Sequence, residues 1–257
     1  MSQPTPVKLS VNLNKVALLR NQRDVGYPSV VEAARIVVAA GAHGITVHPR
    51  PDERHIRRSD VLELAALIAA EFDPAVEYNI EGYPSDDFLA LIRAVRPTQV
   101  TLVPDAPGQR TSDHGWDLHR DAAPGRLINL IAELKESGAR ISLFMDPDPA
   151  AIPVAATVGA DRIELYTGPY AEAFAMGEAS ILLRRYAQAA EAAKDAGLGV
   201  NAGHDLNLDN LPAFCQALPQ LAEVSIGHAI TADALRIGFP AAVEAYLRAI
   251  KRVSRAA

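Results

Sequence analysis

The sequence has a single cysteine, no excess of positive charge and no long apolar run, and each shortage excludes a class of protein. Cys215 is the only cysteine in 257 residues, so an internal disulfide or a cysteine metal cluster cannot form. The formal net charge of -6 argues against a general nucleic-acid binder. No apolar stretch could span a bilayer, and the first residues lack the basic-then-apolar layout of a signal peptide. We therefore expect a cytoplasmic protein without nucleic-acid or membrane partners, in which Cys215 is a buried small hydrophobe rather than a reactive thiol.

What the sequence does contain is a repeated phrase: a helix-like run, a glycine, and a short apolar strand. The phrase occurs at Gly41, Gly138, Gly159 and, more loosely, Gly197. Glycine suits this position because a helix often closes on a left-handed residue, where a Cβ atom is unfavourable. Repeated along a chain, the pattern indicates stacked βα units and a parallel sheet.

The expected strands are regularly spaced, and they lie near residues 7–13, 43–48, 75–81, 98–104, 140–145, 161–166, 198–202 and 222–227. Eight βα units in about 250 residues are typical of a (β/α)8 TIM barrel. A doubly wound sheet would want a Gly-x-Gly-x-x-Gly turn after its first strand, and residues 12–15 contain no glycine. We predict one barrel domain over residues 1–257, with a lid loop at 105–123. Extra helices are expected within 169–197 and after residue 231, where Gly238 to Pro240 break the pattern.

Polar residues occupy the predicted strand ends, which is where barrel enzymes place their active sites. The histidines and carboxylates at these ends suit proton transfer, and we single out His48, Glu81, Glu164 and His204. His43 falls at the opposite end of its strand, so it is expected to be structural. His114 and His119 belong to the predicted lid and stay undecided.

The last two turns favour a phosphate site. Gly203 and the pair Gly227 and His228 follow strands seven and eight, where barrels commonly cradle phosphate with backbone N–H groups. Side chains of Arg20, Arg23 and Arg50 are candidates for binding a second anionic group, because a guanidinium matches phosphate oxygens. We expect Arg54, Arg57 and Arg58 to face solvent.

Other chemistries compete for the same residues. A metal site is disfavoured because no His-x-His or His-x-x-x-His pair occurs, and a serine triad because no Gly-x-Ser-x-Gly elbow occurs. Lys15 at the first strand end leaves open a Schiff-base enzyme of the aldolase kind.

Six segments carry a resemblance to a known family, and they are SVNLNKVALLRNQR, GITVHPRPDERHI, YNIEG, IELYTGPYA, VNAGHDLN and SIGHAI. In order and spacing over about residues 9–250, the chain resembles pyridoxine 5'-phosphate synthases. The resemblance implies a (β/α)8 barrel with extra helices that forms a homo-octamer built from dimers. It implies condensation of 3-amino-2-oxopropyl phosphate with 1-deoxy-D-xylulose 5-phosphate, releasing phosphate and water, without metal or organic cofactor.

The resemblance also implies roles for individual residues. His48 and Glu81 would accept protons, His204 would donate one, and Glu164 would stabilise charge. Binding of the two phosphorylated substrates would involve Asn12, Asn14, Lys15, Arg23, Arg50, His55, Thr111, Asp205, Gly227 and His228.

Two positions depart from the family pattern. Many relatives have Asp-His where this chain has Asn14-Lys15, which puts that substrate contact in doubt unless Lys15 replaces its charge. Relatives have glycine in place of Asp205, whose side chain would be unwelcome beside a phosphate. Two alternatives stay open: another phosphate-handling barrel isomerase or aldolase, and a catalytically silent homologue that binds a phosphorylated ligand. Retention of His48, Glu81 and His204 argues against the silent homologue.

Overall fold

Eight parallel strands close into a barrel in sequence order, as the βα pattern predicts. The computed structural model describes residues 6–251 except 73, 106–108, 110 and 119–123. The strands are β1 Lys8–Asn12, β2 Gly44–Val47, β3 Glu77–Gly82, β4 Gln99–Leu102, β5 Arg140–Met145, β6 Arg162–Tyr166, β7 Gly199–Gly203 and β8 Leu221–Ile226. Pairing of β1 with β8 closes the cylinder, which excludes the doubly wound sheet.

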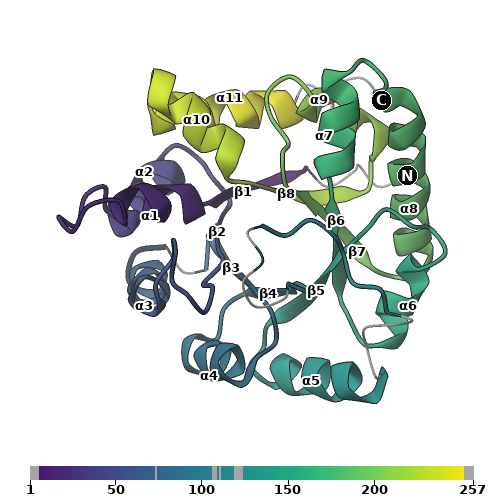
Figure 1. Cartoon of the computed structure of the whole chain (residues 1–257), viewed down its shortest axis with the longest axis horizontal. Helices are drawn as coiled ribbons and strands as arrows, with labels where there is room; N and C mark the ends of the chain where they lie inside the picture. Colours follow the sequence, from purple (N-terminus) through teal and green to yellow (C-terminus); the bar gives the residue numbers. More distant parts are fainter. Residues whose placement is uncertain (1–5, 73, 106–108, 110, 119–123, 252–257) are drawn as a thin grey trace.

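Helices surround the strands on the outside of the barrel (Figure 1). They are α1 Asn14–Arg20, α2 Val30–Ala39, α3 Arg58–Leu67, the π-helical turn η1 Ile68–Phe72, α4 Asp86–Val95, α5 Pro124–Glu136, α6 Ile152–Thr157, α7 Gly168–Ala175, α8 Ala179–Asp195, α9 Leu211–Ala217, α10 His228–Ile237 and α11 Phe239–Lys251. The predicted extra helices are present: α7 precedes α8 after β6, and α10 is separated from α11 at Gly238.

The glycines of the repeated phrase have the backbone conformation that the pattern predicts. Their φ angles are +100° at Gly41, +87° at Gly138, +93° at Gly159 and +77° at Gly197. Each closes a helix and releases the chain into the next strand, so the order of strands around the barrel follows directly from local sequence.

The main hydrophobic core lies between the barrel and its helices, whereas the barrel interior is unusually polar. Barrels of this kind are commonly filled with branched apolar side chains. Here Ser10 Oγ lies 2.6 Å from Thr46 Oγ1, and Thr101 donates a 3.1 Å hydrogen bond to Asn79. At the N-terminal ends of the strands, Arg140 pairs with Glu77. Hydrogen bonds between buried polar groups offset much of the desolvation cost of burial, although Gln99 Nε2 and Ser142 Oγ have no partner among the described residues.

The predicted lid is only partly described, because 106–108, 110 and 119–123 lie outside the described residues. In the described part, Trp116 anchors the segment to the barrel: its indole N–H donates a 2.9 Å hydrogen bond to the carbonyl of Leu102. Among the described residues, no helix has the length and apolar character needed to cross a membrane.

Candidate active site

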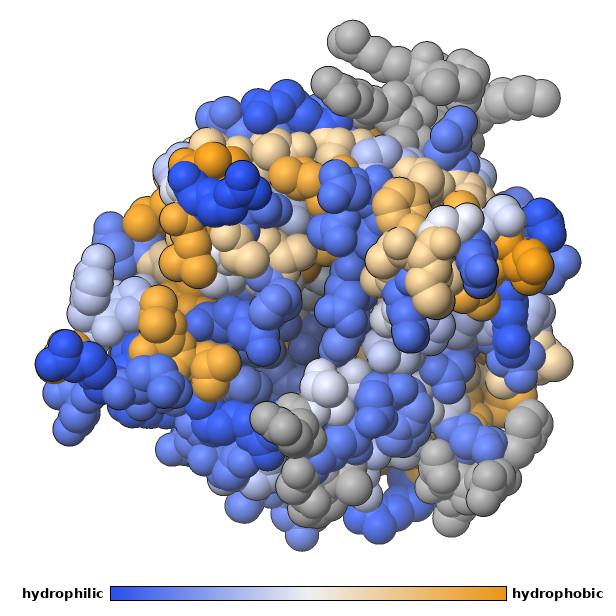
Figure 2. Space-filling view, turned by 45° about the horizontal axis from the view of Figure 1, so that its top comes forward, coloured by the Kyte–Doolittle hydropathy of each residue, from blue (hydrophilic) through white to orange (hydrophobic). Residues whose placement is uncertain are grey.

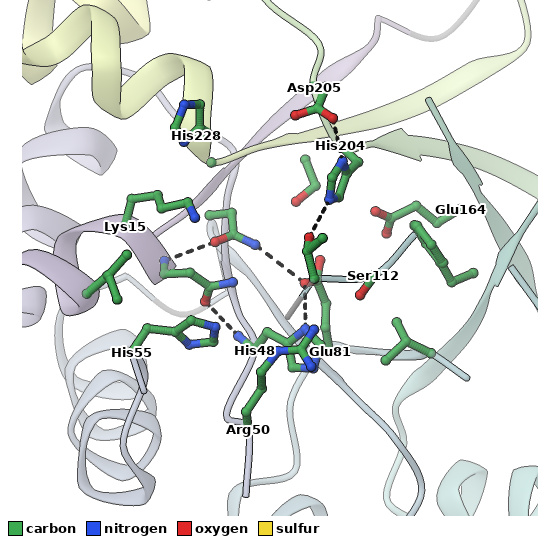
Figure 3. A pocket seen from close by; sticks show the side chains of 18 of the residues that line it. Lys15, His48, Arg50, His55, Glu81, Ser112, Glu164, His204, Asp205 and His228 are labelled. Carbon is green, nitrogen blue, oxygen red and sulfur yellow. Dashed lines mark hydrogen bonds and ion pairs between the residues drawn. The ribbon is translucent and has the colours of Figure 1, made fainter. Parts of the chain in front are cut away.

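A cavity of about 690 Å³ opens at the C-terminal ends of the strands. Side chains from the barrel, from α1 and from the described part of the 105–123 segment converge on it (Figure 3). Its lining consists of Asn12, Asn14, Lys15, Leu18, His48, Arg50, Arg54, His55, Glu81, Val103, Thr111, Ser112, Phe144, Glu164, His204, Asp205, Ser225, Gly227 and His228. The structure thus brings together thirteen of the fourteen candidate residues, and Arg23 is the exception.

Arg23 lies in the exposed turn between α1 and α2, outside the cavity lining. Arg20 is also unavailable to a ligand, contrary to expectation, because its guanidinium is buried in an ion pair with Asp60. The same guanidinium donates a 3.1 Å hydrogen bond to the carbonyl of His55. Arg20 therefore supports the loop that carries His55 instead of binding an anion.

The turn after β1 is hydrogen-bonded to the C-terminal end of β2. The Asn12 side-chain oxygen accepts a 3.0 Å hydrogen bond from the backbone N–H of Asn14. The Asn14 side-chain oxygen in turn accepts a 2.9 Å hydrogen bond from the backbone N–H of His48. Lys15 follows at the start of α1, and its ammonium group faces the cavity (Figure 3).

His48 and Glu81 form a buried pair at the base of the cavity. His48 Nδ1 lies 3.7 Å from Glu81 Oε2, and both residues are at most 9% exposed. Burial raises the pKa of Glu81 to about 8, and the negative charge of Asp105 adds to the shift. Burial and then the neighbouring Arg50 lower the pKa of His48 well below its usual range. At neutral pH this pair is therefore a neutral imidazole beside a mainly protonated carboxyl group.

Glu164 lies across the cavity from His48 (Figure 3). Burial raises the pKa of its carboxyl well above the ordinary value, and the nearby Glu81 adds to the effect. Its Oε2 atom is buried without a hydrogen-bond partner among the described residues. Gly203 makes room for this side chain, because a Cβ atom at that position would lie 2.3 Å from Glu164 Oε1.

Arg50 and His55 form the wall below Lys15. The Arg50 guanidinium pairs with buried Asp105 and donates a 3.0 Å hydrogen bond to the backbone carbonyl of Gln109. Burial lowers the pKa of His55 to about 4, with Arg50 adding to the shift, so this ring is neutral at pH 7. Arg54 also lines the cavity, although we expected it to face solvent. Arg57 and Arg58 are exposed, as expected.

The opposite rim combines His204, Asp205 and the start of α10. His204 Nε2 lies 3.0 Å from the Thr111 hydroxyl, so the described part of the 105–123 segment contacts this rim. Gly227 caps α10, and both Gly227 and His228 line the cavity. The amino end of α10 thus faces the cavity, as the phosphate-site interpretation requires.

Several residues of the site escaped the sequence reasoning. Asp105, three residues beyond the end of β4, pairs with Arg50 and accepts a 2.8 Å hydrogen bond from the hydroxyl of Ser112. Val103, Phe144 and Ser225 line the cavity. The position of Asp105 shortly after a strand is the signal that could have found it, whereas the small and apolar residues carry no chemical signal in a sequence.

The remaining histidines are placed as follows. His43 lies at the N-terminal end of β2, where its ring accepts a 3.2 Å hydrogen bond from the backbone N–H of Leu9. His114 is exposed and pairs with Asp113, and His119 lies outside the described residues. Within the described part of the chain, no group of three or more histidine, cysteine or acidic residues is arranged to hold a metal ion.

A closed (β/α)8 barrel with basic and acidic groups converging at its C-terminal mouth defines a barrel enzyme that acts on small anionic molecules. Comparison with known proteins narrows this class. Residues 9–252 match the family described as "Pyridoxal phosphate biosynthesis protein PdxJ", and the chain belongs to that family.

Similar proteins are named pyridoxine 5'-phosphate synthase. The one from Mesorhizobium japonicum is 57% identical over 245 residues, covering 95% of this chain and 98% of the relative. The one from Albidiferax ferrireducens is 58% identical over 248 residues, covering 95% of this chain and 97% of the relative.

Solved structures of low sequence identity share the fold. Tryptophan synthase from Mycobacterium tuberculosis superimposes with a TM-score of 0.64 at 13% identity, covering 95% of this chain and 93% of that one. Phosphoribosyl anthranilate isomerase from Thermotoga maritima gives a TM-score of 0.58 at 13% identity, with coverage of 96% and 99%. These likenesses concern the barrel alone.

Proposed function

We propose that this chain is a pyridoxine 5'-phosphate synthase, a condensing enzyme of the transferase type. It joins 3-amino-2-oxopropyl phosphate to 1-deoxy-D-xylulose 5-phosphate and releases phosphate and water. The observation that carries the proposal is a cavity with basic groups on two walls and a buried acid–base pair between them, in a chain of this family.

The two basic walls suit two phosphorylated substrates. One wall contains Arg50 and His55, together with the lid residue Thr111, and we assign it to the sugar phosphate. The other contains Asn12 and the amino end of α10 at Gly227 and His228, and we assign it to the aminoketone phosphate. Lys15 and Asn14 lie between the walls, where the lysine supplies positive charge toward the sugar phosphate. Holding both substrates in one orientation is the main source of rate acceleration in such a site.

The acid–base groups lie where the bonds must form. Imine formation, phosphate loss, ring closure and dehydration each require proton transfers, which we assign to His48 and Glu81 as acceptors and His204 as donor. With a pKa of about 8, Glu81 is mainly protonated in the empty site at pH 7. An ammonium or iminium group on the bound substrate stabilises the carboxylate form of Glu81. Substrate binding therefore favours release of the Glu81 proton and converts this residue into the base. Glu164, across the cavity, stabilises positive charge on the intermediate.

The direct test is incubation of the purified protein with both substrates while pyridoxine 5'-phosphate and free phosphate are measured. Equal amounts of the two products support the proposal, and turnover is expected to persist with a chelator present. Loss of turnover in chelator would refute the cofactor-free mechanism. Borohydride trapping followed by mass mapping tests the aldolase alternative, which requires a stable adduct on Lys15.

We also propose that the chain acts in the cytoplasm as an octamer built from dimers. Supporting this, Val25 and Tyr27 of the exposed turn and Leu235 of α10 are 63%, 79% and 77% exposed. Figure 2 shows apolar side chains gathered on the side of the molecule that carries α1 and α10. Exposed apolar groups of this size favour contact with another subunit.

In this arrangement Arg23, on the same turn, would bind substrate only through an assembled interface. Light scattering coupled to gel filtration tests the assembly, and a Tyr27→Asp variant should shift it toward smaller species.

The third assignment is that residues 105–123 act as a lid. The contacts of the Thr111 hydroxyl with His204 and of the Gln109 carbonyl with Arg50 support it, because each joins the segment to a residue that lines the cavity. Hydrogen exchange in this segment should slow when substrate is bound, and unchanged exchange would contradict the assignment.

A further inference from the structure

His204 and Asp205 are two consecutive non-glycine residues in the left-handed backbone region. Their φ angles are +79° and +60°. The surrounding structure holds them there: the buried Thr167 hydroxyl donates to the carbonyls of Gly203 and His204, and the Asn210 amide donates to the carbonyl of Asp205. Uncommon backbone conformations that several contacts maintain are typical of functional positions.

This backbone conformation places the Asp205 carboxylate against Nδ1 of the His204 ring. Asp205 Oδ2 lies 2.8 Å from His204 Nδ1, and His204 Nε2 lies 3.0 Å from the Thr111 hydroxyl. An edge-on contact with Tyr166, with ring centroids 5.2 Å apart, limits rotation of the imidazole. The carboxylate, the imidazole and the hydroxyl form a chain from the rim into the cavity (Figure 3).

The chain of hydrogen bonds defines which nitrogen carries the proton. The hydrogen bond from His204 holds the pKa of Asp205 below its ordinary value, so the carboxylate is ionised at neutral pH. An ionised carboxylate only accepts hydrogen bonds, and Nδ1 must therefore be the donor. In a neutral ring Nε2 is then an acceptor, to which Thr111 donates when no substrate is bound.

We propose that Asp205 is a positioning residue that orients the His204 ring and holds it as the Nδ1–H tautomer. Nε2, which faces the cavity, is thereby the nitrogen that exchanges protons with the substrate. This inference rests on the proposed function, since it supplies the means by which His204 acts as the proton donor. It also gives the Asp205 side chain a purpose other than contact with phosphate.

The charge of Asp205 is compatible with a neighbouring phosphate because cations flank it. After His204, the groups that lower the pKa of Asp205 are His228 and Lys15. From β6, the Tyr166 ring contacts His204, and the Glu164 carboxyl packs against the neighbouring Gly203. All of these remain in place when Asp205 alone is replaced.

The test compares Asp205→Asn and Asp205→Gly with the wild-type protein. Asparagine and glycine both tolerate positive φ, so neither change should disturb the backbone. The matched control is Asp209→Asn, which alters an exposed aspartate four residues along the same loop. Thermal unfolding of all three variants checks that each one is folded.

The first readout is the ¹⁵N NMR spectrum of the imidazole rings, with the His204 signals assigned from a His204→Gln variant. We expect protonated Nδ1 in the wild type and in Asp209→Asn. In Asp205→Asn and Asp205→Gly, the Nε2–H form should gain population. This readout needs no substrate, so it stands even if the protein makes no pyridoxine phosphate. An unchanged tautomer in both Asp205 variants would overturn the proposal.

The second readout is steady-state kinetics with both substrates. Loss of the oriented donor should lower kcat by at least about tenfold with little change in KM. A changed KM with unchanged kcat would indicate a substrate contact and overturn the positioning role. Absence of activity in the wild type would instead refute the proposed function.

Discussion

Replacing Glu81 with glutamine removes a buried ionisable group while keeping its size, and we expect the variant to be inactive but more stable than the wild type. The side chain is 9% exposed, and burial raises its pKa from 4.5 to about 8. An amide has the same shape as the protonated carboxyl and can still accept the 3.4 Å hydrogen bond from Asn12. The variant therefore mimics the form of Glu81 that the folded protein prefers.

The magnitude follows from linkage between protonation and folding. Because the pKa of Glu81 is higher in the folded state, its contribution to stability is complete below pH 4.5 and is lost as the pH rises to 8. From pH 4.5 to 7 the loss spans about 2.5 pH units at about 1.4 kcal/mol each, or about 3 kcal/mol. Glutamine does not ionise, so the Glu81→Gln variant does not lose this stability as the pH rises. At pH 7 its free energy of unfolding should exceed that of the wild type by an amount on the order of 3 kcal/mol.

The assay is urea denaturation of both proteins at equal concentration, at several pH values between 4.5 and 8.5. The difference between the two should be small at pH 4.5 and should increase toward pH 8. Glu63→Gln on the exposed face of α3 is the control, and its stability should differ from wild type by less than about 0.5 kcal/mol at every pH. A Glu81→Gln variant with no advantage at pH 7, or with an advantage independent of pH, would refute the assignment of a raised pKa. Turnover near the wild-type level would refute the role of Glu81 in catalysis.

Three further substitutions test other parts of the site. His48→Asn should abolish formation of pyridoxine phosphate with the fold retained by circular dichroism; near-normal turnover would contradict its role as a proton acceptor. Arg50→Lys should raise the KM for the sugar phosphate about tenfold or more, since an ammonium cannot replace the guanidinium fork that also pairs with Asp105; an unchanged KM would place that phosphate elsewhere. Gly203→Ala should displace the Glu164 carboxyl, whose Oε1 would lie 2.3 Å from the new Cβ, and lower kcat about tenfold or more; wild-type kinetics would show that the position of Glu164 is unimportant.

The histidines and glutamates of the site could be predicted because barrel topology converts sequence position into spatial position. His48, Glu81, Glu164 and His204 each lie in the C-terminal part of a predicted strand or just beyond it, and parallel strands in a closed barrel bring all these parts to one mouth. The same rule correctly separated His43, at the other end of its strand, from His48.

The arginines could not be assigned in the same way, because in loops and helices the sequence position of a residue does not tell whether its side chain points toward the cavity. Arg20, Arg23 and Arg50 looked alike as cation candidates, yet only Arg50 lines the cavity. The guanidinium of Arg20 forms an ion pair with Asp60, which lies 40 residues away in the chain. Arg54 lines the cavity, although we expected it to face solvent. Side-chain direction in these segments depends on partners that are distant in sequence.

The barrel and the set of polar residues near its strand ends could be predicted from local signals, namely glycine-closed helices and short apolar strands. The charge states of those residues depend on the folded chain. Burial of Glu81 beside Asp105, and of Glu164 against Gly203, requires chain segments that are far apart in sequence. The folded chain also brings the Asp205 carboxylate within 2.8 Å of His204 Nδ1, with both residues at positive φ, which the order of residues in the sequence does not reveal.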